Sequence, residues 1–199
     1  MNMKKYLTLI AMSTLLLSQV ALAGTPIDVT RSKVEWLGEK VMGQHNGNLQ
    51  LKKGEVEIEN RTLVAGRLVF DMKSINVLDI KDPKKKGNLE KHLKDDAFFG
   101  VTQYPFAIFE ITSAVSIQKA GPGEENYEIK GELTIKGITH AVSFKTLVDM
   151  KSKHSSASGK IIVDRTLYGI RYGSGKFFDG LGDKAIYDDF VISFDVLTK

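Results

Sequence analysis

The sequence predicts an all-β domain of mostly antiparallel strands with one short helix. Apolar and polar residues alternate at every second position in seven or more stretches, which is typical of strands with one buried and one solvated face. Turn-forming residues separate these stretches. Short strands at intervals of about ten residues favour a β-sandwich or a closed barrel, and the pattern by itself leaves both alternatives open.

The alternating stretches follow one another along the chain. In order, their apolar positions are Val34 and Trp36; Val56 and Ile58; Leu68, Phe70 and Met72; Ala107, Phe109 and Ile111; Ile129, Leu133 and Ile135; Val142, Phe144 and Thr146; and Phe190, Ile192, Phe194 and Val196. Hairpin turns need positive φ or the fixed φ of proline. We therefore expect turns at Asn46-Gly47, Lys53-Gly54, Gly121-Pro122-Gly123 and Lys136-Gly137.

Two segments lack the two-residue alternation. A helix is predicted from Asn88, a good N-cap residue, because Leu89 and Leu93 are four residues apart, and it is expected to end before Phe98. The lysine run at 80–87 is expected to be a solvated loop, with attraction to anionic lipid headgroups as the weaker alternative. The Gly-rich segment 168–185 is expected to be a flexible, solvated loop.

The first residues have the pattern of a cleavable signal peptide. Lys4 and Lys5 precede an apolar run that ends in Ala21-Leu22-Ala23, so we expect cleavage after Ala23 and export to a bacterial periplasm. Removing residues 1–23 leaves 176 residues, enough for one domain at 24–199, with 26 basic and 24 acidic residues. A net charge of +2 argues against nucleic acid as a partner. The absence of cysteine rules out disulfides and suits this compartment.

The residues that usually carry chemistry do not form a recognisable catalytic or metal motif. The four histidines are far apart in sequence, and His92 with Asp95 and Asp96 is more simply a surface ion pair than a catalytic group. The Gly-rich segment fits neither a phosphate-binding loop nor a calcium loop, and it lacks the strand and helix of a dinucleotide site. We therefore expect no catalytic residue, no metal and no cofactor.

Several segments resemble the YceI-like family of periplasmic lipid-binding proteins. They are, in order, "TPIDVTRSKVEW", "DMKSINV", "KHLKDDAFFGVTQYPFAIF", "YEIKGELTIKGITHAVSF" and "DRTLYGIRYGSG". The most specific is the third, with His92-Leu93, Phe98-Phe99 and Tyr104-Pro105. The resemblance covers about residues 25–198. It implies a single extended, lipocalin-like antiparallel β-barrel of about eight strands, which holds a long isoprenoid chain such as a polyprenyl lipid or a quinone tail.

The resemblance and the strand pattern together give a set of expected ligand-binding residues. We expect the tunnel to be lined by Trp36, Leu68, Phe70, Met72, Phe109, Leu133, Ile135, Phe144, Ile192 and Phe194. Its ends are assigned to Leu93, Phe98, Phe99, Phe177 and Phe178. Contact with a polar headgroup is assigned to His45, His92 and Arg165.

The expected function is therefore a non-enzymatic carrier or storage protein for a long apolar lipid, with at most transient contact with a membrane surface. An interaction protein with a solid barrel core and a protein partner, met by the outward Phe106 and Ile108, is the main alternative. A third alternative is an enzyme that acts on a lipid, but the sequence contains no recognisable nucleophile or metal-binding motif to support it. Monomer and homodimer remain open.

Overall fold

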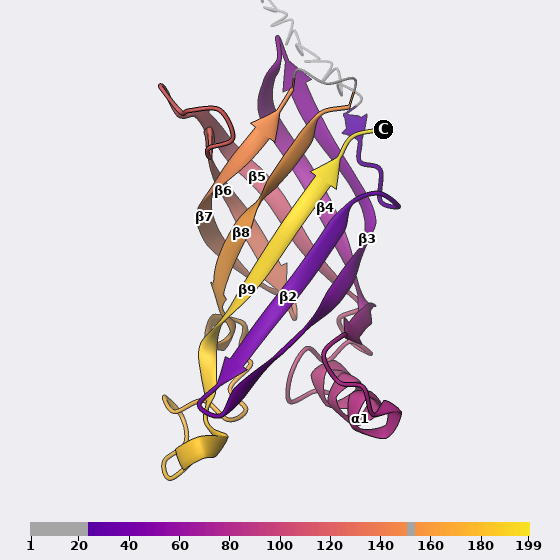
Figure 1. Ribbon diagram of the computed structural model, residues 1–199, viewed down its shortest axis with the longest axis vertical. Coiled ribbons are helices and arrows are strands. Elements are labelled where there is room, and N and C mark those ends of the chain that lie inside the picture. Colours follow the sequence, from indigo (N-terminus) through magenta and orange to yellow (C-terminus); the bar gives the residue numbers. More distant parts are fainter. Residues whose placement is uncertain (1–23, 151–153) are drawn as a thin grey trace, which may run out of the picture.

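The computed structural model describes residues 24–150 and 154–199 (Figure 1). The predicted signal peptide lies outside the described residues. The strands are β1 (Thr25–Pro26), β2 (Lys33–Lys40), β3 (Gly43–Glu59), β4 (Thr62–Val77), β5 (Phe106–Ser116), β6 (Tyr127–Ile135), β7 (Ile138–Asp149), β8 (Ser156–Asp164) and β9 (Ile186–Leu197). The helices are α1 (Pro83–Lys94) and two 3₁₀ turns, η1 (Arg165–Tyr168) and η2 (Gly182–Lys184).

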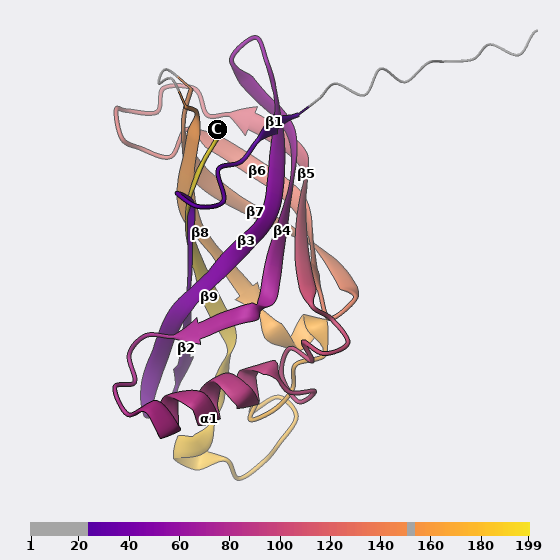
Figure 2. The same ribbon diagram turned by 90° about the vertical axis from the view of Figure 1, so that its right-hand side faces the viewer.

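Strands β2 to β9 form a closed antiparallel barrel, which confirms the predicted fold class. Each strand pairs with the next in sequence, and β9 pairs with β2, with Trp36 opposite Ile192. The barrel is elongated, and α1 lies across one of its ends (Figure 2). Among the described residues, no helix has the length and apolar character needed to cross a bilayer.

Two of the expected turns are wrong, because Asn46-Gly47 and Lys53-Gly54 lie inside the long strand β3. These glycines are needed for close approach. A Cβ atom on Gly47 would lie 1.9 Å from the Asn76 carbonyl oxygen and 2.6 Å from the Trp36 ring, and one on Gly54 would lie 2.7 Å from Leu68 Cδ2. The expected turn at Lys136-Gly137 is confirmed, since both residues have positive φ between β6 and β7.

The helix begins earlier than predicted. Its N-cap is Asp82, whose carboxylate accepts a hydrogen bond from the Lys85 backbone N–H at 2.8 Å, and Pro83 takes the first helical position. Asn88 therefore lies inside the helix, and the lysine run forms its first turns rather than a loop. Further along the helix, Glu90 Oε1 accepts a hydrogen bond from the Val77 N–H at 3.0 Å. This bond attaches α1 to the end of β4.

The barrel wall is incomplete between β7 and β8. Strand β8, which the alternation pattern did not reveal, pairs with β7 only from Ser156 to Gly159, opposite Thr146 to Asp149. Beyond these four pairs the strands separate, although each keeps its other neighbour. The inward residues of β7 change accordingly. Thr146 and Val148 are buried where β8 pairs, whereas Val142 and Phe144 are only partly buried where it does not.

Candidate functional site: an apolar cavity in the barrel

A cavity of about 220 Å³ runs inside the barrel toward the end covered by α1. Side chains of β2, β4, β5, β6, β8 and β9 line it. Many of these inward residues, such as Leu68, Phe70 and Ile192, are only partly buried because they face open space rather than each other. An apolar cavity of about 150 Å³ is already large enough to bind benzene. The barrel therefore encloses an apolar cavity rather than a fully packed core.

One polar atom in this lining has no partner. The Trp36 ring lies against Gly47, and its Nε1–H is buried without a hydrogen-bond acceptor among the described residues. A buried N–H without an acceptor costs about 1–3 kcal/mol. The indole N–H is therefore an unsatisfied donor in the wall of the cavity.

Aromatic side chains surround the end of the cavity beneath α1. Phe98 and Phe99 line it together with Leu89 and Leu93 of the helix, and the Phe99 ring meets Phe190 of β9 edge-on at 6.3 Å. These residues come from three separate segments, so the end of the cavity exists only in the folded chain. We call this end, with its rim formed by the β2–β3 tip, α1 and segment 170–190, the mouth.

His92 supports the mouth from outside. Its ring packs edge-on against Phe98 at 4.8 Å and against Tyr172 at 4.6 Å, and its Nδ1 lies 3.0 Å from an Asp95 oxygen. Burial raises the pKa of Asp95, but the hydrogen bonds from His92 and from the Ala97 backbone N–H lower it more. The pKa of Asp95 therefore lies below its usual value. The histidine thus joins the helix to the Gly-rich segment and is not part of the cavity lining.

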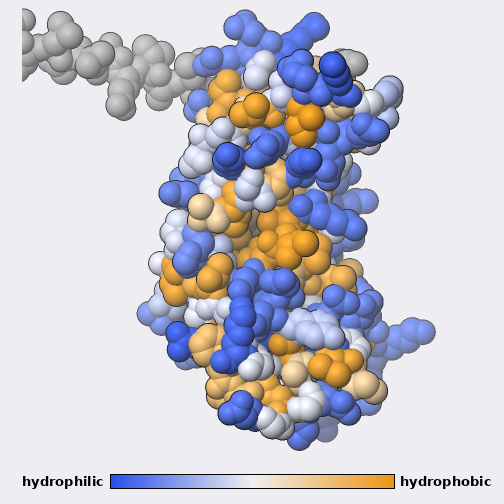
Figure 3. Space-filling view, turned by 90° about the vertical axis from the view of Figure 1, so that its left-hand side faces the viewer, coloured by the Kyte–Doolittle hydropathy of each residue, from blue (hydrophilic) through white to orange (hydrophobic). Residues whose placement is uncertain are grey.

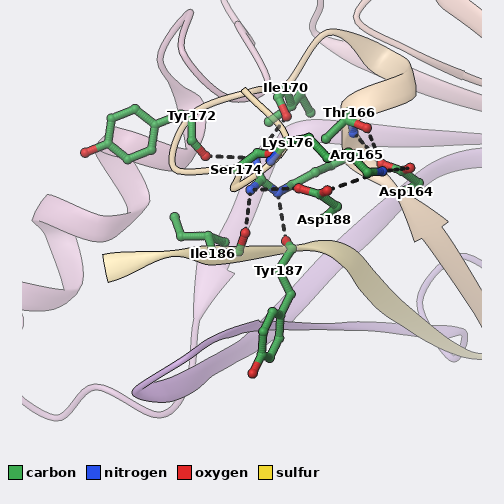
Figure 4. A network of polar contacts seen from close by, with 10 residues as sticks. All are labelled: Asp164, Arg165, Thr166, Ile170, Tyr172, Ser174, Lys176, Ile186, Tyr187 and Asp188. Carbon is green, nitrogen blue, oxygen red and sulfur yellow. Dashed lines mark hydrogen bonds and ion pairs between the residues drawn. The ribbon is translucent and has the colours of Figure 1, made fainter. Parts of the chain in front are cut away.

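Arg165 fixes the Gly-rich segment against β9 (Figure 4). The residue is 4% exposed, and its guanidinium donates to four backbone carbonyls at 2.9–3.0 Å. Those carbonyls belong to Ile170, Tyr172, Ile186 and Tyr187. Burial lowers the pKa of this guanidinium, and the nearby carboxylates of Asp188 and Asp164 partly offset the effect. Arg165 thus touches the cavity, but its donors are committed to the protein itself.

The Gly-rich segment is anchored at several points rather than flexible throughout, and residues 175–180 are exposed, as expected of a solvated loop. Ile170 and Ser174 are completely buried, and Lys176 bridges the carboxylates of Asp164 at 3.0 Å and Asp188 at 3.3 Å. The hydrogen bonds to these two carboxylates raise the pKa of Lys176. Segment 170–190 is therefore anchored to the barrel and forms one side of the mouth.

Polar and charged residues of the lining are concentrated at the mouth. Glu39, Lys40, His45, Tyr187 and Asp189 all contribute to the lining there. The His45 Nδ1 lies 2.8 Å from an oxygen of Asp79, a residue just beyond β4. These lining residues present mainly apolar atoms to the cavity, so its surface is apolar along its whole length, and their polar groups lie around its end.

Comparison with known proteins agrees with this geometry. The model of the YceI-like domain family matches residues 26–197. The chain belongs to this family. None of the curated proteins matches it.

Solved structures share the YceI-like fold. BcnA of Burkholderia cenocepacia is 19% identical, with a TM-score of 0.67 over 87% of this chain and 99% of its own. A polyisoprenoid-binding domain from Saccharophagus degradans is 14% identical, with a TM-score of 0.63 over 89% and 99%. The Campylobacter jejuni YceI protein is 15% identical, with a TM-score of 0.52 over 75% and 83%. At these identities the likeness establishes a common fold.

The YceI-like domain brings most of the predicted ligand-binding residues to one cavity. Those that line it are Trp36, His45, Leu68, Phe70, Met72, Leu93, Phe98, Phe99, Phe109, Leu133, Ile135, Arg165, Ile192 and Phe194. Four others do not line it. Phe144, an inward residue of β7, packs between Phe109 at 5.6 Å and Phe194 at 5.7 Å without lining the cavity, and His92, Phe177 and Phe178 lie outside the mouth.

The cavity also includes residues that were not among the expected ligand-binding residues. They are Val34, Gly38, Glu39, Lys40, Leu49, Ile75, Leu89, Ala107, Ile161, Val163, Ile170, Ile186, Tyr187, Asp189, Phe190 and Val196. Ile161 and Val163 belong to the unpredicted strand β8, whose small residues and Lys160 hide its alternation. The described residues of this domain contain no group of three or more potential metal ligands.

Proposed function

We propose that this YceI-like domain is a non-catalytic binding protein that holds a long isoprenoid chain in its barrel cavity. The observation that carries the proposal is the cavity itself, which is enclosed by the barrel strands and has an apolar surface. A polyprenyl lipid or a quinone has a long apolar chain that fills such a space and one polar group that remains at the mouth.

The energetics favour a long chain over a short one. Burying each carbon group contributes about 0.8 kcal/mol, so one five-carbon isoprene unit offers about 3–4 kcal/mol. Association costs roughly 4–15 kcal/mol. A chain of two units is therefore hardly retained, whereas a chain of many units binds even when its burial is incomplete.

The polar group of the ligand belongs at the mouth. Lys40, His45 and Asp189 are the groups placed to meet it, because the Arg165 donors already serve backbone carbonyls. The alternative role, an interaction protein with a solid core, needs inward side chains that meet across the barrel. The space in front of Leu68, Phe70 and Ile192 argues against it.

Adjacent residues on β8 provide a matched test. Ile161 lines the cavity, whereas its neighbour Ile162 is 69% exposed on the outer face. We expect Ile161→Trp to fill part of the cavity and to lower the affinity for a forty-carbon prenyl alcohol at least tenfold. Ile162→Trp, which adds the same side chain outside the barrel, is expected to bind like the unaltered protein.

Native mass spectrometry and a tritiated prenyl alcohol measure the two affinities. Purified protein is also extracted with organic solvent, and a long-chain lipid is expected in the extract. Equal binding by both variants, or tighter binding of a ten-carbon than of a forty-carbon alcohol, would contradict the proposal. Thermal melting shows whether each variant is folded.

Export is the second part of the proposal. The signal pattern of residues 1–23 and the absence of cysteine support a periplasmic carrier or store for this lipid. Amino-terminal sequencing of the protein from a periplasmic extract is expected to begin at Gly24. A protein that retains Met1 in the cytoplasm would contradict this part alone.

A further inference from the structure

Exposed apolar side chains gather around the mouth of the cavity. Met42 at the β2–β3 tip is 66% exposed, and Phe177 and Phe178 are 44% and 50% exposed. Val41, Leu78, Tyr172 and Tyr187 are exposed as well. At the opposite end of the barrel, the β3–β4 turn instead presents Glu59, Asn60, Arg61 and Thr62. The mouth end therefore exposes more large apolar side chains than the opposite end, where Val64 and Val115 are exposed.

Hydrogen bonds join the segments that carry these apolar residues. The Val41 N–H donates to the Ala185 carbonyl at 3.0 Å, which fastens the β2–β3 tip to segment 170–190. The Leu78 N–H donates to the Asn46 carbonyl at 2.9 Å. The Arg171 guanidinium lies over the Phe177 ring at 4.7 Å. The exposed apolar residues are thus held on one connected rim rather than on separate mobile tips.

Helix α1 adds positive charge beside this rim. Segment 81–94 contains six lysines against Asp82 and Glu90, which gives a net charge of +4. Both acids are engaged, Asp82 as the N-cap and Glu90 with Val77 and Lys86. Lys84, Lys85 and Lys91 are exposed and have no ion pair with any carboxylate in the described part of the chain.

These features differ from those of a face built for a protein partner or a second copy. Two copies that met through this face would bring their lysine-rich helices together. Segment 171–184 carries Asp179 and Asp183 against Arg171, Lys176 and Lys184, so its contribution is mainly apolar. Lysines beside aromatic and aliphatic side chains are instead the combination that binds the surface of an anionic bilayer.

We propose that the mouth end of the barrel docks on an anionic bilayer surface. The lysines of α1 lie against the lipid headgroups, and Met42, Phe177 and Phe178 enter the interfacial layer. This inference rests on the proposed function for its purpose, since docking in this orientation aligns the cavity with the acyl layer. An isoprenoid chain then passes between bilayer and barrel without crossing water.

The test measures vesicle binding by the purified protein with no isoprenoid added. Vesicles contain either phosphatidylcholine alone or phosphatidylcholine with 40% phosphatidylglycerol, and co-sedimentation is measured at two salt concentrations. We expect binding to the anionic vesicles that weakens at high salt. Each lysine near an anionic surface contributes about fivefold. The triple variant Lys84→Gln, Lys85→Gln, Lys91→Gln is therefore expected to bind about a hundredfold more weakly.

A second triple variant controls for net charge. Lys33→Gln, Lys52→Gln, Lys160→Gln removes the same charge from exposed positions on the barrel strands. It is expected to bind vesicles nearly as well as the unaltered protein. The double variant Phe177→Ser, Phe178→Ser is expected to weaken the binding that persists at high salt. Equal losses in the two triple variants, or equal binding to neutral and anionic vesicles, would overturn the docking proposal.

Uptake of a prenyl alcohol in vesicle-free solution separates this proposal from the proposed function. The α1 triple variant is expected to take up the alcohol normally in that assay, which also shows that it is folded. Normal uptake without selective vesicle binding would overturn docking alone. Absence of uptake by the unaltered protein would overturn the proposed function, whatever the vesicles show.

Discussion

The indole of Trp36 lies so close to Gly47 that a Cβ atom there would be 2.6 Å from Trp36 Cε2 and Cζ2. The two residues face each other across β2 and β3. This contact places the indole over Gly47 in the cavity wall. A side chain larger than hydrogen at residue 47 displaces either the ring or the backbone.

Gly47→Ala is therefore expected to destabilise the protein by about 2–3 kcal/mol, since overpacking of this kind costs about 1–3 kcal/mol and the Asn76 carbonyl also obstructs the new methyl group. Urea denaturation measures the free energy of unfolding. Gly38→Ala is the control, because a Cβ atom at Gly38 meets nothing within 4 Å. Equal stability of the two variants would contradict the close-approach explanation.

Arg165 is expected to be structural. Arg165→Met leaves the carbonyls of Ile170, Tyr172, Ile186 and Tyr187 without a donor, so we expect a loss of about 3–5 kcal/mol. Arg165→Lys is expected to restore little, since an ammonium cannot reach carbonyls on two sides.

The matched control for these variants is Arg171→Met. Arg171 is exposed and lies over the Phe177 ring, so its loss is expected to cost less than about 1 kcal/mol. Thermal and urea unfolding compare the variants. A stable Arg165→Met variant with altered ligand affinity would instead make Arg165 a ligand contact.

Tyr168 provides a pH-dependent prediction. Its side chain is 1% exposed, its hydroxyl has no hydrogen-bond partner among the described residues, and burial raises its pKa to about 12. The folded state therefore favours the neutral phenol. This contribution is fully present below pH 10, the pKa in the unfolded chain, and is lost as the pH rises from 10 to about 12.

Tyr168→Phe is expected to have nearly the same unfolding free energy as the unaltered protein at pH 7, because no hydrogen bond is lost. Above pH 10 the variant becomes relatively more stable, by up to about 2–3 kcal/mol. Chemical denaturation at several pH values measures the difference. A constant difference from pH 7 to pH 12 would contradict the assignment.

The short β7–β8 pairing predicts uneven hydrogen exchange. Backbone N–H groups of residues 138–145 and 160–164 that point into the gap lack a strand partner, so they are expected to exchange much faster than those of β6. Strand β6 pairs on both sides and is the internal control. Uniform protection across β6, β7 and β8 would contradict an open wall.

An apolar hollow midway along the face that includes β7 and β8 accompanies this gap (Figure 3).

Most strands and the division between their inward and outward residues could be predicted from the sequence, because both depend on a local period of two residues, whereas β8 and the full length of β3 were missed. That period placed Phe70, Phe109 and Ile192 in the interior, where the structure has them. The sequence also contained the signal for the start of α1, since Asp82 before Pro83 is a standard helix signal. This signal was missed because the lysine run that follows it was interpreted as a loop.

Other features depend on residues far apart in the chain, and only the tertiary structure decided them. Asn46-Gly47 has the local signature of a turn, yet Trp36 and Asn76 make it a point of close packing. Arg165 is a clamp because β9 brings Ile186 and Tyr187 to it. The sequence by itself determined that the strands have an apolar inner face, since alternation is a local pattern. Whether that face encloses a solid core or a cavity depends on how distant strands pair to close the barrel, which no short stretch of residues encodes.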